Sequence, residues 1–245
     1  IVLLKNEDEV LPITKEKYKK VAVIGAFAKE PRYQGGGCTL VNPVRISKPY
    51  EELKALGGNE LSFSYAQGYE LKNETTTEML EEAQKVAAEA DVAIIFAGLW
   101  VAYDREGFDR KQLEIDSSHI RLIEEVAKVQ KKIVVVLSNG DAVTMGTWLD
   151  KVGAVVEQFL VGETVGEAIA KVLLGKVNPS GKLPVTFPKR LEDTSAYLYF
   201  PGECNHHLYG EGIFVGYRYY EKKKIEPLFP FGYGMSYTQF TYSNM

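Results

Sequence analysis

The sequence predicts an α/β fold in which a mostly parallel sheet lies between layers of helices, followed by an irregular, aromatic-rich tail. Apolar runs of strand length alternate with stretches of helical length, which is the pattern of a parallel sheet with helices on both faces. The runs are continuously rich in Val and Ile, as strands buried on both sides are. From Asn178 onward, Pro, Gly and Tyr become frequent and the helical periodicity ends.

The elements of the first half follow in order along the chain. A strand-like run opens the sequence at 1–4, and a second strand is expected at 21–25. A short helix at 51–56 is predicted to stop at the two glycines 57–58, and the alternating segment 61–65 predicts a strand. The next helix, 76–90, has threonines at its start that offer a cap.

The second half continues the alternation, with strands expected at 92–97, at 133–137 and at 154–156 together with 159–160. Helices are expected at 117–128, whose apolar residues recur on one face, and at 163–174, which Gly175 ends. We expect one domain over residues 1–245, with the sheet and helices in 1–190 and a wrapping tail in 191–245. The chain opens without an initiator Met and stops after an aromatic run, so we interpret it as a piece of a longer protein.

Composition excludes several classes of function. The 245 residues are 45% hydrophobic and 25% charged with a net charge of -4, which leaves no basic footprint for nucleic acid and no polybasic membrane patch. No apolar run approaches the roughly 20 residues of a membrane span. Cys38 and Cys204 are too few for a disulfide framework or a zinc site; one bridge stays open, with reduced thiols and a cytoplasmic location favoured.

A polar, charge-dense loop follows the apolar run 92–97 and is the best candidate for chemistry. Ligands of open α/β sheets bind beyond the carboxyl ends of strands, and residues 104–110 would lie there. Glu106 is the candidate for a proton-transferring carboxylate, and the glycine after it lets backbone and ligand approach closely. Asp109 and Arg110 are expected to brace the loop, and Asp104 is the reserve candidate for the acid.

Several segments, in order, resemble the C-terminal α/β-sandwich domain of glycoside hydrolase family 3, which includes many β-glucosidases. They are 1–6 with 11–12, 21–25, the glycine-rich 35–39 (Gly-Gly-Gly-Cys-Thr), 106–110 (Glu-Gly-Phe-Asp-Arg), 178–184 (Asn-Pro-Ser-Gly-Lys-Leu-Pro) with 186–188, 211–220 (Glu-Gly-Ile-Phe-Val-Gly-Tyr-Arg-Tyr-Tyr), and 230–238 (Pro-Phe-Gly-Tyr-Gly-Met-Ser-Tyr-Thr). The resemblance covers essentially the whole chain.

The resemblance implies a six-stranded sheet and a retaining, exo-acting β-glycosidase, in the first place a β-glucosidase that hydrolyses terminal β-D-glucosyl residues of small β-glucosides or oligosaccharides. It implies Glu106 as the acid/base. The aspartate nucleophile would lie on a TIM-like barrel domain that this chain lacks, because eight βα units need about 200 residues. A fibronectin III-like domain can follow in the family. The glycine-rich loop, with Gly36, Gly37, Cys38 and Thr39, would contact the sugar.

Two departures from the family pattern and several alternatives stay open. Cys38 and Thr39 stand where many relatives have small hydroxyl residues, which puts that sugar contact in doubt; residues 161–163 replace a more usual proline-glycine-glutamine. The domain could instead only shape or bind the sugar pocket, or belong to a β-xylosidase. A free-standing nucleotide-binding domain is disfavoured, because the glycine spacing does not match the dinucleotide or P-loop motifs.

No cofactor or metal is expected. His119 begins an amphipathic helix and is expected at the surface. The group formed by Glu203, Cys204 and the adjacent His206 and His207 has weak ligand spacing for a metal site. The serines lack the glycine-flanked elbow of a serine hydrolase. No nucleic-acid or membrane partner is expected.

Overall fold

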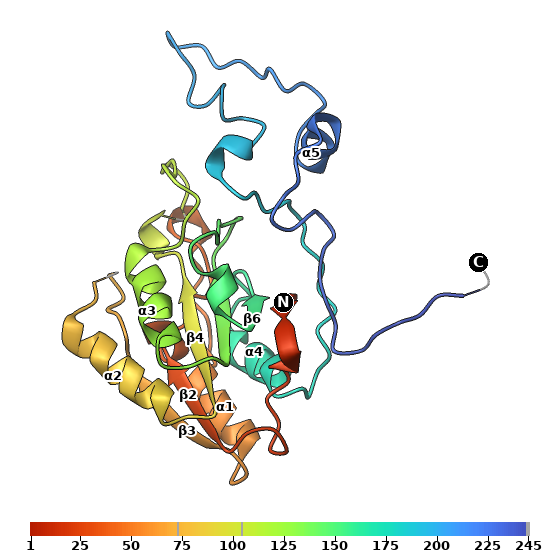
Figure 1. Ribbon diagram of the computed structural model, residues 1–245. Coiled ribbons are helices and arrows are strands. Elements are labelled where there is room, and N and C mark those ends of the chain that lie inside the picture. The colour runs from red at the N-terminus through yellow and green to blue at the C-terminus, as the bar shows by residue number, and fades with distance from the viewer. Residues whose placement is uncertain (73, 104, 244–245) are drawn as a thin grey trace.

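The computed structural model describes residues 1–72, 74–103 and 105–243 and contains one six-stranded sheet (Figure 1). The strand order is β1-β6-β5-β4-β2-β3, with β1 antiparallel to β6 and the other neighbours parallel. The predicted six-stranded, mostly parallel α/β fold is therefore confirmed. The strands are β1 Val2–Asn6, β2 Lys20–Ile24, β3 Ser62–Ala66, β4 Val92–Gly98, β5 Ile133–Ser138 and β6 Ala154–Glu157.

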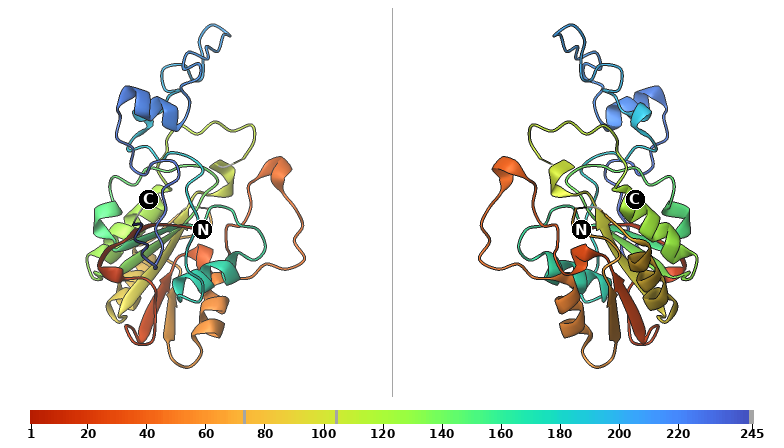
Figure 2. Two further views of the ribbon diagram at one scale, coloured as in Figure 1. Left: turned by 90° about the vertical axis from the view of Figure 1, so that its right-hand side faces the viewer. Right: turned by 90° about the vertical axis from the view of Figure 1, so that its left-hand side faces the viewer.

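Four helices form the outer layers: α1 Pro49–Gly57, α2 Thr77–Ala88, α3 Ser117–Ala127 and α4 Val165–Leu173. Helix α1 packs against α4, and α2 packs against α3; the two pairs lie on opposite faces of the sheet (Figures 1 and 2). Helix α2 begins where the sequence predicts, because the Thr76 side chain accepts a hydrogen bond from the Met79 amide and satisfies a free N–H group of the first turn.

The central strands explain why the apolar runs in the sequence are continuous. Every residue of β4 and β5 is buried, because helices cover both faces of the sheet. Strands β2 and β4 are neighbours, yet the chain leaves β2 toward β3 through α1 and leaves β4 toward β5 through α3. Their carboxyl ends therefore form a topological switch point, where the loops after the two strands open a crevice.

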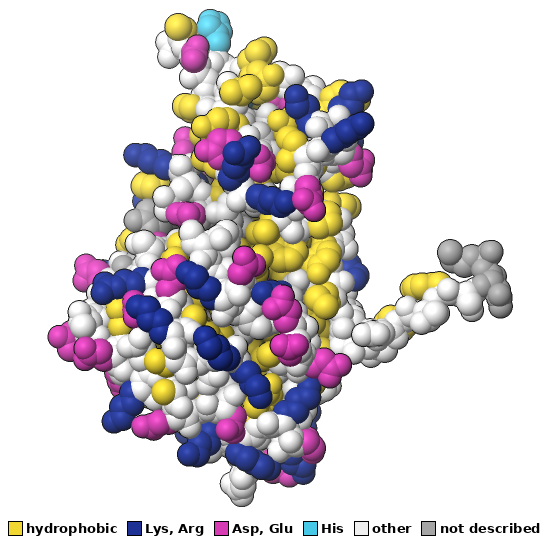
Figure 3. All heavy atoms as spheres, in the orientation of Figure 1, with side chains coloured by type: hydrophobic (Ala, Val, Ile, Leu, Met, Phe, Trp, Pro, Cys, Tyr) yellow, Lys and Arg dark blue, Asp and Glu magenta, His cyan; other side chains and the backbone are white. Residues whose placement is uncertain are grey.

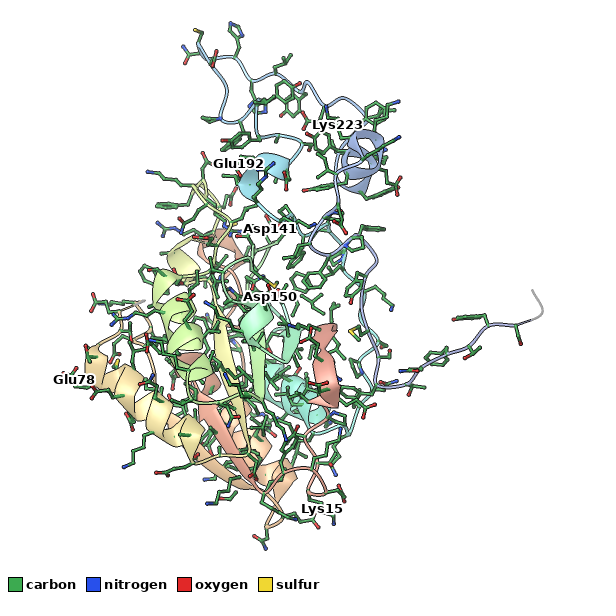
Figure 4. The ribbon with its side chains drawn as sticks, viewed as in Figure 1. Lys15, Glu78, Asp141, Asp150, Glu192 and Lys223 are labelled. Carbon is green, nitrogen blue, oxygen red and sulfur yellow. The ribbon has the colours of Figure 1, made fainter. Side chains whose placement is uncertain are left out.

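The C-terminal tail (residues 191–243) extends beyond the carboxyl edge of the sheet and then returns along β1. Figure 4 shows Asp141, which follows β5, at this edge, with Glu192 and Lys223 beyond it and Lys15 at the opposite end. The Met235 amide donates to the Leu3 carbonyl at 2.8 Å. Hydrophobic side chains gather on the projecting part of the tail and at its base, and charges of both signs are mixed over the whole visible face (Figure 3). The division at residue 190 stays a prediction.

The structure corrects two local expectations and adds one short α-helix to the otherwise irregular tail. The segment 159–160 is not part of a strand: β6 ends at Glu157, and Phe159 has a left-handed φ of 56° that turns the chain away. The tail contains a helix, α5 Tyr217–Lys223, although its sequence lacks apolar periodicity. His119 is fully buried rather than at the surface, because its ring lies against Tyr69 and Phe27.

Both cysteines are exposed and free, as expected for reduced thiols. Over the described part of the chain, every helix is too short or too polar to cross a membrane.

Candidate active site

Two loops meet at the switch point between β2 and β4. One is the glycine-rich loop (residues 34–41), which follows β2, and the other is the acid loop (residues 99–116), which follows β4. Figure 2 shows the first standing off the sheet and the second arching beyond the strand ends. The backbones of the two loops pair with each other, because Gly36 and Arg105 form an isolated parallel β-bridge.

The base of the site leaves no room for side chains where the strands end. A Cβ on Gly25 would lie 2.4 Å from the Phe96 carbonyl oxygen, and one on Gly98 would lie 2.1 Å from the Ser138 carbonyl oxygen. Both glycines have positive φ angles, 113° and 154°, which residues with a side chain rarely adopt. These close approaches set where the two loops leave the sheet.

Side-chain hydrogen bonds hold the glycine-rich loop in shape. The Gln34 amide accepts from the Val41 N–H at 3.0 Å and donates to the Val41 carbonyl at 3.3 Å, which closes the loop at its ends. Inside it, the Thr39 hydroxyl donates to the Gly36 carbonyl at 3.1 Å. The buried Arg32 side chain donates to the Gln34 and Leu99 carbonyls, and so ties this loop to the end of β4.

The acid loop is anchored at its base and open at its tip. The Trp100 amide donates to the buried Asp116 carboxylate at 3.1 Å, and the Thr144 amide donates to the Leu113 carbonyl at 2.9 Å. At the tip, Glu106 is exposed and lies in a turn with Gly107, whose φ is 77°. The carboxylate is thus presented to solvent from an anchored loop.

The side chains of Cys38 and Glu106 are in contact. The Cys38 thiol donates a hydrogen bond to Glu106 Oε2, with 2.6 Å between Sγ and the oxygen. The neighbouring carboxylate disfavours a thiolate, and this raises the pKa of Cys38 above its ordinary value. The structure therefore places Glu106 beside Cys38 and its neighbour Arg105 beside Gly36, whereas the Thr39 hydroxyl is engaged within its own loop.

The hydrogen bond between Cys38 and Glu106 does not involve the other predicted residues of the acid loop. Asp109 is exposed, and Arg110 donates from Nη1 to the Ala142 carbonyl at 3.2 Å, which links the acid loop to the segment after β5. Their role as loop supports stays a prediction. Asp104, the reserve acid, lies outside the described residues.

A cavity of about 300 Å³ lies between the start of the two loops. Apolar and aromatic side chains dominate its lining, among them Phe27, Tyr33, Leu40, Trp100 and Val101. The switch-point crevice is therefore lined on one side by apolar surface.

Sequence reasoning missed a buried polar cluster at the carboxyl ends of β5 and β6. The Glu157 carboxylate accepts from Asn139 Nδ2 at 2.9 Å and from the Phe159 amide at 2.7 Å. Gln158 donates to the Ser138 hydroxyl at 2.6 Å. Complete burial raises the pKa of Glu157 to about 8. The available signal was a polar pair directly after each apolar run.

The group of Glu203, Cys204, His206 and His207, which the sequence disfavours as a metal site, lies far along the tail. Glu203 and His206 pair through their backbones at a hairpin tip, with the exposed Cys204 between them. In the ranges that the structure describes, no three His, Cys, Asp or Glu side chains gather in a way that could hold a metal ion.

Comparison with known proteins gives consistent similarities. Residues 1–217 match the model of the glycosyl hydrolase family 3 C-terminal domain. A thermostable beta-glucosidase B of Acetivibrio thermocellus is 52% identical over 246 residues, which cover 100% of this chain and 32% of that protein. An exo-alpha-(1->6)-L-arabinopyranosidase of Bifidobacterium longum is 40% identical over 248 residues, with 98% and 32% covered.

Solved structures show the same likeness. The crystal structure of a Bifidobacterium adolescentis GH3 beta-glucosidase superposes with a TM-score of 0.90 at 41% identity, covering 96% of this chain and 34% of that one. The chain thus spans about a third of the length of each of these three relatives, 32% for the first two and 34% for the third.

Proposed function

The chain belongs to the glycosyl hydrolase family 3 C-terminal domain family, and on that premise we propose that it supplies the acid/base of a retaining, exo-acting β-glycosidase. The acid/base is Glu106. The observation that carries this proposal is the position of Glu106: an exposed carboxylate on an anchored loop at the switch point between β2 and β4. Among the ion pairs between described residues, none engages this carboxylate.

The chemistry needs a second carboxyl group from outside this chain. Retaining glycosidases use two carboxyl groups about 5–5.5 Å apart, of which one attacks the anomeric carbon and the other protonates the leaving oxygen and then deprotonates water. Glu106 takes the second role. A TIM-like barrel elsewhere in the same protein supplies the nucleophile, and a fibronectin III-like domain is a further partner in the family.

The proposed substrates are small β-glucosides or oligosaccharides, from which terminal β-D-glucosyl residues are removed. The 52% identity to a protein named as a beta-glucosidase supports this choice. The arabinopyranosidase at 40% identity supports a second candidate, a terminal arabinopyranosyl residue. The residues of this chain present the acid/base equally in either case, so the sugar would be selected mainly by the barrel.

The test is a leaving-group comparison in the intact protein that contains this chain. Glu106→Ala should slow the hydrolysis of aryl β-glucosides with poor leaving groups by about 100-fold or more, because the leaving oxygen of these substrates needs protonation. Aryl β-glucosides with activated leaving groups should lose much less rate in the first step, which forms the glycosyl-enzyme. Glu114→Ala, which removes another exposed glutamate side chain from the same loop, is the matched control and should change both classes equally little. Uniform loss in both variants, or no loss with Glu106→Ala, contradicts the proposal.

A further inference from the structure

The glycine-rich loop is fixed relative to the acid loop at more than one point. Arg32 ties the start of the loop to Leu99, and the Gly36–Arg105 bridge pairs the backbones. A Cβ on Gly36 would lie 3.0 Å from the Cβ of Arg105, so the two chains are packed closely. Cys38 lies two residues after Gly36, and Glu106 lies one residue after Arg105. The bridge between the two loops therefore holds Cys38 within reach of Glu106.

A thiol at this place supplies an uncharged donor to the carboxylate. The thiol S–H is a weak donor, but a charged acceptor strengthens a hydrogen bond. The neighbouring carboxylate raises the pKa of Cys38, which keeps the donor proton on sulfur. Glu106 needs such help because its loop tip is exposed and Gly107 beside it has open space around its Cα.

We propose that Cys38 is a positioning residue for Glu106: its thiol holds the carboxylate against the glycine-rich loop in the orientation from which it exchanges protons with the substrate. This inference rests on the proposed function of Glu106. Cys38 is a departure from the family pattern. The proposal gives this cysteine a role in the reaction, because its thiol donates a hydrogen bond to the Glu106 carboxylate.

The contact itself is tested by thiol labelling, independently of activity. In the intact protein, iodoacetamide is used with mass spectrometry to follow alkylation of Cys38 and Cys204, both of which are exposed. Removing the charge with Glu106→Gln should speed alkylation of Cys38 by about threefold to tenfold at a pH below the thiol pKa. Cys204 is the internal control, and its rate should stay the same. An unchanged Cys38 rate overturns the contact.

The positioning role is tested by kinetics. Cys38→Ala removes the donor and should lower kcat on substrates with poor leaving groups by about threefold to tenfold with little change in KM. Cys38→Ser keeps a donor and should restore at least half of wild-type turnover, and Cys204→Ser is the surface control. Equal losses in Cys38→Ala and Cys38→Ser, or losses that are independent of the leaving group, overturn the role.

The two proposals fail in different ways. If Glu106→Ala leaves turnover unchanged, the proposed function fails and the positioning role fails with it. If Glu106→Ala is slow but Cys38→Ala is as fast as wild type, only the positioning role is overturned.

Discussion

The thiol of Cys38 donates a hydrogen bond to the carboxylate of Glu106, although 68 positions separate the two residues in sequence. The contact exists because β2 and β4 are neighbours in the sheet and their following loops converge at the switch point. The sheet topology, more than any local motif, therefore assembles the candidate site.

The close approach of β4 to β5 beneath the acid loop predicts a large effect of Gly98→Ala. The new Cβ would lie 2.1 Å from the Ser138 carbonyl oxygen, at a φ of 154°. We expect this variant to lower the free energy of unfolding by about 3 kcal/mol or more and to lower turnover as the acid loop shifts. Chemical denaturation measures the first effect.

Gly146→Ala is the matched control, because open space surrounds its Cα and the residue is exposed. Its free energy of unfolding should stay within about 0.5 kcal/mol of the wild type. Similar losses in both variants would show that the β4–β5 approach has no special constraint.

The buried carboxyl of Glu157 predicts that stability falls as the pH rises. Burial raises its pKa from the ordinary 4.5 to about 8, so between these values the folded protein holds a proton that the unfolded chain has released. The free energy of unfolding should therefore decrease over that range, by a few kcal/mol in order of magnitude. Glu157→Gln should flatten this slope in denaturation curves recorded at successive pH values, and an unchanged slope would contradict the assignment.

The buried His119 predicts that protein stability depends on pH in the opposite direction under acidic conditions. Burial lowers its pKa from 6.5 to about 3, so between these values the unfolded chain binds a proton that the folded protein does not. Stability should decrease as the pH falls from 6.5 toward 3. His119→Asn keeps an acceptor for the Gly98 amide, which contacts Nδ1 at 3.1 Å, and should reduce the slope there while leaving the alkaline slope of Glu157 intact. Retention of the full acid slope would rule out His119 as its source.

The sheet and its helices could be predicted from the sequence because their physical cause is local. Strands such as β4 and β5 are buried on both faces and so consist of continuous apolar residues. The start of α2 carries a cap at Thr76, and glycines mark the ends of α1 (Gly57 and Gly58) and α4 (Gly175). These patterns lie within a few residues of one another, and the elements follow them closely.

The errors share a different cause: long-range packing decided the outcome. His119 lies on a helix with polar neighbours, yet contacts with Tyr69, Phe27 and the Gly98 backbone bury it. The left-handed turn at Phe159 is accompanied by a hydrogen bond from its amide to the Glu157 side chain, which Asn139 from the loop after β5 holds in place across the sheet edge.

One part of the candidate site follows from a local sequence pattern, and another part depends on long-range packing. The position of Glu106 after a buried strand was visible in the sequence, but its contact with Cys38 depends on which strands are neighbours and on a bridge between two loops. Strand order cannot be obtained from local periodicity, so this pairing appears only in the structure.

The central claim, that Glu106 is the acid/base of a retaining glycosidase, is tested most directly by azide rescue of Glu106→Ala in the intact protein. With an activated aryl β-glucoside, azide can attack the glycosyl-enzyme without the base that the variant lacks. We predict that azide raises turnover of Glu106→Ala, leaves the wild type nearly unchanged, and yields a β-glucosyl azide. No rescue together with wild-type turnover in the variant, or an α-glucosyl azide as product, would contradict the claim.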